Sequence, residues 1–198
     1  MPRTAQRGDD SMNAQRRRAQ VLEAASMCFR EKGFHGTSMA QISAAAGMST
    51  GHIYHYFKSK EDIIAGIVER ERDEVELLLA GMRDAANPED AIAAFANGTE
   101  RSVEMNKDIS RAALKMEILA EAARNPAIAE VVHRHNAEIK AAHQRIFDAT
   151  DPKLEARMEL AAALMEGLSV RALRNPDLDK QIDLELMRDV VRCIFSAT

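Results

Sequence analysis

The stretch TSMAQISAAAGMSTGHIYHYFKSKED, residues 37–62, decides the fold of the N-terminal part of the chain. Ser38, with a glutamine three residues later, fits the capping-box pattern that starts a helix. Gly47 is placed to end that helix, and Ser49 is placed to cap a second short helix over residues 50–57. The stretch therefore predicts two short helices joined by a tight glycine turn.

A longer helix is expected ahead of this stretch. Gly33 is placed to end it, with Phe34 able to fold back on its last turn. Residues 1–15 have no apolar core, so we expect a disordered polar lead-in there rather than a secretory signal. The apolar face of the helix recurs at helical spacing: Val21, Leu22, Ala25, Cys28 and Phe29.

From Ser59 onward the periodicity predicts helices throughout, with proline-containing pairs such as Asn125-Pro126 as breaks. We expect an all-α protein with a three-helix, helix-turn-helix head at 16–58 and a larger helical body at 59–198. The charged helix 59–82 is expected to link them. The remaining predicted helices span residues 88–105, 108–124, 126–148, 152–174 and 178–196.

The charge is unevenly distributed along the chain. Residues 1–60 hold nine Lys or Arg and four Asp or Glu, a net charge of +5, whereas the whole chain has −4. A basic N-terminal part on an acidic body is typical of a DNA-binding head joined to a domain with another partner. No apolar run approaches the roughly 20 residues of a membrane span. Two distant cysteines make a disulfide framework unexpected and favour a cytoplasmic protein.

A helix, a tight turn and a second helix with a polar outer face form the geometry that places a helix in the major groove of DNA. The second helix begins with small or polar residues. Its Tyr54 and His55 project outward, where they can reach phosphates and base edges. Lys58 and Lys60 follow it at the start of the next helix. The DNA-binding candidates from the residues themselves are Arg17, Thr50, Gly51, His52, Tyr54, His55, Lys58 and Lys60.

The stretch 19–66, with FREKGFHGTSMAQISAAAGMSTGHIYHYFKSKEDII, strongly resembles the N-terminal domain of the TetR family of bacterial transcriptional regulators. The only departures noted are Ser43 in place of the usual alanine and Ile64 in place of leucine. The resemblance implies an all-α homodimer with a ligand-binding body. It also implies DNA contacts from Ser38, Thr50, Gly51, Tyr54, His55 and Lys60. The body phrase KMEILAEAARNPAIAEVVHRHNAEIKAAHQRIF is similar to bodies of the BetI-like and the fatty-acid or drug-responsive subgroups.

The body offers candidates for an effector pocket and for a dimer interface. Because it contains no tryptophan or tyrosine, an apolar or acyl-type effector is favoured over a cationic one, although methionines at helical spacing are also ordinary core residues. The pocket candidates are Phe95, Met105, Leu114, Met116, Leu119, His133, Asn136 and Met165. Surplus apolar residues in 153–174 and 178–196 predict the dimer interface, with Met165, Leu168, Leu186, Val190 and Ile194 as candidates.

Metal binding and catalysis find no support in the sequence. His133 and His135 point away from each other on a helix, so no metal site is predicted, and no cofactor is expected. No phosphate loop or nucleophile motif is present, and Glu117 with Glu121 is interpreted as a solvated helix face.

We therefore expect a ligand-responsive transcriptional regulator, and not an enzyme. It would be a homodimeric repressor released from a pseudo-palindromic DNA operator by a small-molecule effector, without a membrane partner. The alternative is a helical small-molecule-binding or interaction module that does not bind DNA.

Overall fold

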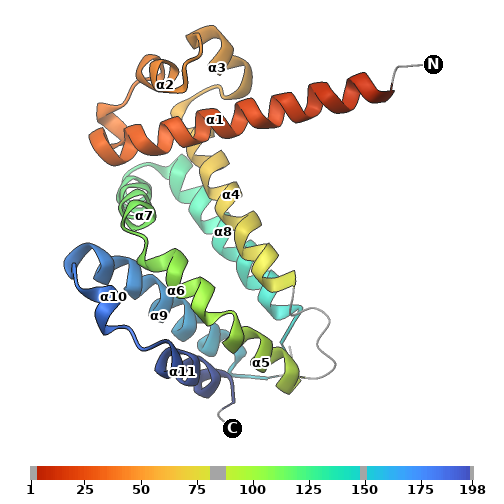
Figure 1. Ribbon diagram of the computed structural model, residues 1–198, viewed down its shortest axis with the longest axis vertical. Helices are drawn as coiled ribbons and strands as arrows, with labels where there is room; N and C mark the ends of the chain where they lie inside the picture. Colours follow the sequence, from red (N-terminus) through yellow and green to blue (C-terminus); the bar gives the residue numbers. More distant parts are fainter. Residues whose placement is uncertain (1–3, 81–87, 148–150, 197–198) are drawn as a thin grey trace. The chain divides into compact units, whose positions relative to one another are not determined.

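A computed structural model of the chain describes residues 4–80, 88–147 and 151–196, which form helices joined by short turns (Figure 1). The expected all-α class is confirmed for these residues. The helices are α1 (Thr4–Gly36), α2 (Met39–Ala46), α3 (Thr50–Tyr56), α4 (Lys60–Ala80), α5 (Pro88–Asn97), α6 (Thr99–Lys107), α7 (Ile109–Ala122), α8 (Pro126–Gln144), α9 (Leu154–Arg174), α10 (Leu178–Gln181) and α11 (Leu184–Ser196).

The chain divides into two compact units. Unit 1 comprises Met1–Glu69 and Glu117–Val131, and unit 2 comprises Arg70–Met116 and Val132–Thr198. This division differs from the expected domains. Unit 1 also includes the first part of α4, the end of α7 and the start of α8. The first part of α4 belongs there because its apolar residues, among them Ile63 and Ile67, are buried.

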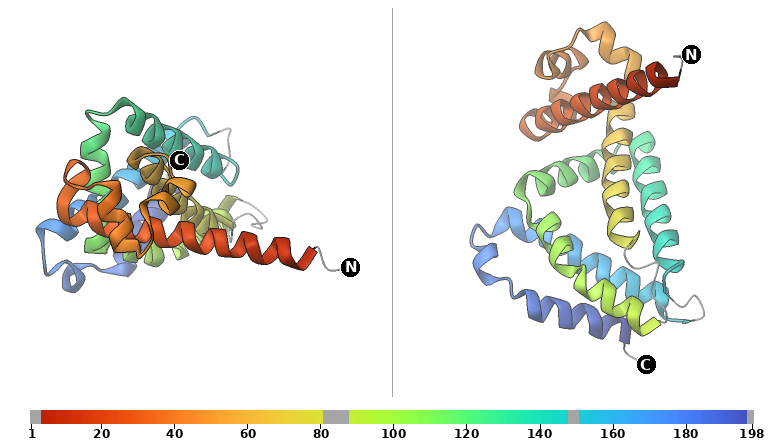
Figure 2. Two further views of the ribbon diagram at one scale, coloured as in Figure 1. Left: turned by 90° about the horizontal axis from the view of Figure 1, so that it is seen from above. Right: turned by 45° about the vertical axis from the view of Figure 1, so that its right-hand side comes forward.

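Helix α1 is longer than expected, since it begins at Thr4 and runs past the other helices of unit 1 (Figure 2). Residues 4–15 are therefore helical rather than a disordered lead-in. No proline follows Pro2 until Pro88, and hydrogen bonds between neighbouring turns support the helix, such as the one from Arg16 Nη2 to Asn13 Oδ1 at 3.2 Å. The expected break at Gly33 is confirmed by its φ of 71°.

The core of unit 1 forms where α1, α2, α3 and α4 meet. Helix α4 passes so close to α1 that a Cβ on Gly66 would lie 2.9 Å from a methyl group of Leu22. The guanidinium of Arg18 covers the Phe57 ring at 4.5 Å and also reaches Glu69 at 3.4 Å. The largest fully buried side chains that these four helices contribute are Val21, Phe29, Ile42, Ile53, Phe57, Ile63 and Ile64.

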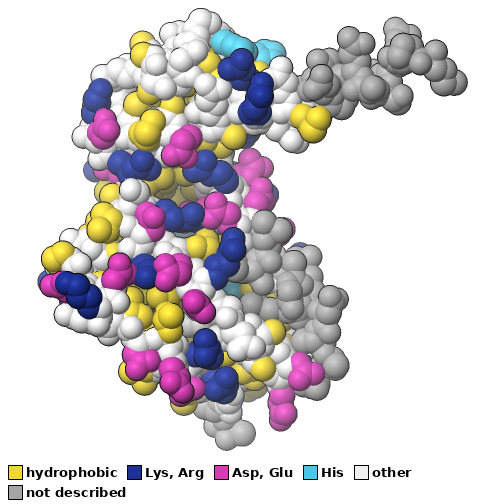
Figure 3. Space-filling model, viewed as in Figure 1, with side chains coloured by type: hydrophobic (Ala, Val, Ile, Leu, Met, Phe, Trp, Pro, Cys, Tyr) yellow, Lys and Arg dark blue, Asp and Glu magenta, His cyan; other side chains and the backbone are white. Residues whose placement is uncertain are grey.

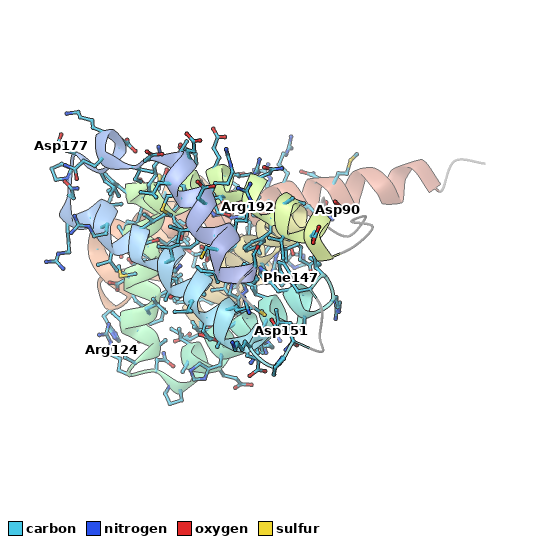
Figure 4. All side chains as sticks on the ribbon, turned by 90° about the horizontal axis from the view of Figure 1, so that it is seen from below. Asp90, Arg124, Phe147, Asp151, Asp177 and Arg192 are labelled. Atoms are coloured by element: carbon cyan, nitrogen blue, oxygen red, sulfur yellow. The ribbon has the colours of Figure 1, made fainter. Side chains whose placement is uncertain are left out.

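The core of unit 2 is organised around the three phenylalanines of the body. Phe147 stacks on Phe195 with ring centroids 4.6 Å apart, and Phe95 meets both rings edge-on (Phe147 is labelled in Figure 4). His143 lies beside them and its Nδ1 is 2.9 Å from the carbonyl oxygen of Ile139. Burial lowers the pKa of His143, so the neutral imidazole is favoured.

Two helices of unit 2 are shorter than expected. The predicted helix 88–105 is interrupted at Gly98, the N-cap of α6, because glycine weakens a helix interior. The predicted helix 178–196 is divided into α10 and α11, because the Asp183 carboxylate accepts the N–H groups of Glu185 and Leu186 and so caps a new helix. No helix among the described residues has the length and apolar character needed to cross a membrane.

Gly47 provides a test of the turn between α2 and α3. It has φ 62°, a conformation that costs an L-residue about 1 kcal/mol or more. We expect Gly47→Ala to lower the free energy of unfolding by about this amount in denaturant titrations, even though no atom lies within 4 Å of the added methyl group. Gly51→Ala is the matched control, because Gly51 also has open space but sits in a helix, where alanine is favoured. Equal free energies of unfolding for the two variants would contradict the positive φ that is assigned to Gly47.

Candidate nucleic-acid interface

The predicted capping box at the start of α2 is confirmed. The Ser38 hydroxyl oxygen accepts from the N–H of Gln41 at 3.2 Å, and the N–H of Ser38 donates to Gln41 Oε1 at 2.7 Å. At the other end, Gln20 of α1 donates to the carbonyl oxygen of Ala46 at 2.7 Å. Helix α2 is therefore fixed at both ends, and the Ser38 hydroxyl proton stays available to an external acceptor such as a phosphate oxygen.

The turn between α2 and α3 is held by Ser43. Its buried hydroxyl donates to the carbonyl oxygen of Met48 and accepts from Thr50 Oγ1 at 3.3 Å. The departure from alanine at this position thus has a structural role. The Thr50 hydroxyl donates this weak hydrogen bond to Ser43. It must therefore break the bond before it can donate to a phosphate oxygen.

Helix α3 has one buried and one exposed side. Ser49 caps it by accepting from the N–H of His52 at 3.3 Å, and Ile53 with the C-cap residue Phe57 is buried in unit 1. Tyr54 is half exposed, at 50 %. Tyr54 and His55, which were predicted to project outward, are exposed, and so are the candidates Gly51, His52 and Lys58.

Tyr56 orients the two histidines of α3. Its half-buried ring lies 5.4 Å from the His52 ring and meets the His55 ring edge-on at 5.1 Å. Contacts with a ring that is itself anchored restrict both imidazoles on the exposed side of the helix.

Helices α2 and α3 carry no acidic side chains of their own, because no Asp or Glu occurs between residues 32 and 60. A carboxylate lies close to the end of α3, since that of Asp62 accepts from the N–H of Lys58 at 2.9 Å. Figure 3 shows histidine atoms over α3 next to Lys and Arg atoms, and no acidic atoms over α2 and α3 on this face. Helices that carry no carboxylates and that present cations and polar aromatic groups suit a polyanion such as nucleic acid.

The basic candidates differ in where they point. Lys58 is exposed, and Arg17 is partly exposed with Nη1 3.1 Å from Gln20 Oε1. Lys60 instead donates to the carbonyl oxygens of Phe34 and Thr37, and its ammonium lies 4.2 Å from the centre of the Phe34 ring. Lys60 therefore holds the turn between α1 and α2 rather than extending into solvent.

The pocket candidates are not all brought together. Phe95 and Met165 pack against the core of unit 2 around Phe147 and Phe195, and Leu114 is buried. Leu119 belongs to unit 1 and is 38 % exposed. His133 and Asn136 are exposed on α8, whereas Met105 and Met116 are partly buried.

Sequence reasoning missed His135 and the phenylalanine pair of the unit 2 core. His135 Nδ1 is buried and has no hydrogen-bond partner among the described residues, and burial lowers the pKa of this imidazole. Phe147 and Phe195 could have been found by noting that they are, with Phe95, the only aromatic residues of the body other than histidine.

The dimer candidates also separate into two groups. Leu186 and Val190 are exposed on α11, at 61 % and 38 %. Met165 and Ile194 pack against the core of unit 2, and Leu168 is buried. Further exposed apolar side chains that were not named as candidates lie on α9: Leu160, Val170 and Leu173.

Sequence comparison relates both parts of the chain to one family. Residues 21–67 match "Bacterial regulatory proteins, tetR family", and residues 83–197 match "Tetracyclin repressor-like, C-terminal domain". The HTH-type transcriptional regulator UidR of Escherichia coli K12 is 33 % identical over 138 residues, which cover 69 % of this chain and 67 % of UidR. The HTH-type transcriptional repressor KstR2 of Mycobacterium tuberculosis H37Rv is 25 % identical over 173 residues, 87 % of this chain and 76 % of KstR2.

Solved structures show the same fold. Salmonella enterica GusR superposes with a TM-score of 0.70 at 27 % identity, covering 91 % of this chain and 96 % of GusR. A TetR transcription regulator from Haloarcula marismortui superposes with a TM-score of 0.69 at 17 % identity, covering 93 % of this chain and 98 % of that one.

Gly51 tests whether α3 approaches a nucleic acid closely. Its added Cβ would meet nothing within 4 Å in the protein itself, so the structure gives no internal reason for glycine here. We expect Gly51→Ala to keep the stability of the fold and to weaken binding to a DNA fragment selected from random sequences by about tenfold, because the methyl group would separate the helix start from the base edges. Fluorescence anisotropy measures the affinity. Unchanged affinity would mean that glycine is merely tolerated.

Proposed function

Because the chain belongs to the TetR family of bacterial transcriptional regulators, we propose that this DNA-binding regulator is a repressor that a small-molecule effector releases from its operator. The observation that carries the proposal is the exposed side of α3, which has no carboxylate of its own and whose opposite side is fixed in the core by Ile53 and Phe57. A helix that is rigidly held and electrostatically open on one side can enter the major groove.

We assign roles to the residues on this side of unit 1. Gly51 allows close approach, and His52 and His55 donate hydrogen bonds to base edges. Tyr54 and Lys58 contact phosphates, and Ser38, Thr50 and Arg17 add contacts from the flanks. Lys60 acts indirectly, because its ammonium holds the turn ahead of α2.

Two heads are needed to read a pseudo-palindromic operator, with half-sites one helical turn of DNA or a multiple of it apart. The exposed apolar side chains of α9 and α11 support a homodimer through these two helices, because such side chains lose contact with water when a second copy covers them. Leu186 and Val190 are central to the proposed interface.

We place the effector in unit 2. The partly buried Phe95 and Met165 supply an apolar surface, and the unpartnered Nδ1 of His135 supplies a polar group that a ligand can satisfy. An effector that binds better to a conformation with low DNA affinity shifts the population away from the operator. The proposed site of action is the cytoplasm, and no catalytic step is part of the proposal.

A salt titration tests the DNA-binding role and separates it from the alternative of a helical module that does not bind DNA. We expect the logarithm of the affinity to fall linearly with the logarithm of the salt concentration. Lys58→Ala should weaken binding to all sequences alike and reduce the slope by about one, because one phosphate contact is lost. Lys153→Ala, which removes an exposed lysine of unit 2, is the control and should leave both quantities unchanged.

His55→Ala should differ from Lys58→Ala in kind. It should alter the preferred base at one operator position, as read by repeating the selection from random DNA. A uniform loss of affinity would contradict the base contact, and a folded native protein that binds no DNA at low salt would overturn the proposed function.

The dimer interface has its own test. We expect Val190→Glu to give monomers in sedimentation experiments, because a carboxylate would lose its hydration in an apolar interface. The control is Cys193→Ser, a change at another exposed position of α11 that introduces no charge. A dimer that persists in Val190→Glu would place the interface elsewhere.

A further inference from the structure

The end of α1 carries a backbone N–H that donates to a side chain outside the helix. Gly33 has φ 71° and ψ 169°, which breaks the helical path, and the N–H of Phe34 donates to Oε1 of Glu117 at 2.6 Å. These residues are 83 positions apart and lie in the same compact unit. A carboxylate that accepts from a backbone N–H forms one of the stronger hydrogen bonds in proteins.

The rest of Phe34 is held equally firmly. Its carbonyl oxygen accepts from Lys60 of α4, which also donates to Thr37 O at 2.7 Å. Its ring is 4 % exposed and packs on Phe29 with centroids 5.7 Å apart. Phe34 is thus fixed through its N–H by α7, through its carbonyl by α4 and through its ring by α1.

A second carboxylate of α7 strengthens the same attachment. Glu121, one turn after Glu117, is 1 % exposed and lies 3.0 Å from Nε2 of His35. Arg124, labelled in Figure 4, donates to the same carboxylate from Nε at 2.6 Å. The interpretation of Glu117 and Glu121 as a solvated face is therefore wrong, since a buried carboxylate persists only where polar groups compensate its lost hydration.

The attachment leads directly into the helix-turn-helix. Thr37 Oγ1 donates to the carbonyl oxygens of Gly33 at 2.8 Å and Cys28 at 3.1 Å. Ser38, the next residue, caps α2, and Ser43 of α2 holds the turn that leads to α3. The residues that follow Phe34 thus lead through Thr37 and Ser38 to the first turn of α2. From there Ser43 connects α2 to the turn before α3.

We propose that Glu117 is a positioning residue for operator binding: its carboxylate fixes the Phe34 peptide and through it the orientation of α2 and α3. The proposal rests on the DNA-binding function proposed above. It assigns Glu117 no contact with DNA.

Two conservative variants separate the effect of the length of the Glu117 side chain from the effect of its charge. Glu117→Gln keeps the reach and an acceptor oxygen but loses the charge, whereas Glu117→Asp keeps the charge but withdraws it by one methylene. We expect Glu117→Gln to bind the selected operator within about threefold of the native chain, and Glu117→Asp and Glu117→Ala to bind about tenfold more weakly, because a buried donor is left without its acceptor. Glu130→Ala is the matched control, an exposed glutamate of the same 117–131 segment.

A second readout does not depend on DNA. In protein labelled with ¹⁵N-phenylalanine, amide hydrogen exchange at Phe34 should accelerate about tenfold or more in Glu117→Asp and Glu117→Ala, and should stay slow in Glu117→Gln. Exchange at Phe147 in unit 2 should be unchanged in all variants, which distinguishes a local change from general unfolding. If Glu117→Ala fails to fold, the comparison of the Asp and Gln variants still decides.

The outcomes are distinct. Operator affinity in Glu117→Asp equal to that of Glu130→Ala overturns the inference while leaving the DNA-binding function intact. Weak binding by Glu117→Gln together with native-like binding by Glu117→Asp shows that charge matters and position does not, which also overturns it. Absence of DNA binding by the native chain overturns the proposed function itself, and the positioning role with it.

Discussion

The left-handed backbone at Gly33 is the constraint on which unit 1 depends. It ends the straight run of α1 and turns Phe34 into the core, so that the N–H of Phe34 points at Glu117 and its carbonyl at Lys60. A side chain here would be strained by its φ, and its Cβ would lie 3.1 Å from the Glu117 carboxylate. The glycine at position 33 thus allows α4 and α7 to bind the backbone of one residue of α1, Phe34, through its carbonyl oxygen and its N–H.

Helix α3 is stabilised from the side that faces the core of unit 1. Seven residues are too few for a helix to be stable alone, so α3 depends on its Ser49 cap, on the Ser43 hydroxyl and on burial of Ile53 and Phe57. Its exposed residues contribute little to that stability. They are consequently free to vary with the sequence to be recognised, which is how one scaffold can serve many regulators.

Local rules predicted the head well, because caps and left-handed glycines act over three or four residues; Ser38, Gly33 and Gly47 lie as expected. The Glu117 contact was beyond such rules, since periodicity cannot show that a carboxylate will meet a peptide 83 residues away. In the body, periodicity identified apolar faces but not their partners. Met165 and Ile194 therefore proved to belong to the core of unit 2, whereas Leu186 is exposed. The Asp183 cap was a local signal that was overlooked.

The membership of 117–131 in unit 1 bears on how regulators of this kind can be recombined. A chimaera that joins this head to a foreign body by a cut after residue 58 would carry Phe34 and His35 away from Glu117 and Glu121. It would also leave the core of unit 1 without Ile63, Ile118 and Ile128, all buried here. The module that can be transplanted is therefore discontinuous. It consists of the N-terminal segment to Glu69 together with Glu117–Val131, which comprises the end of α7 and the start of α8.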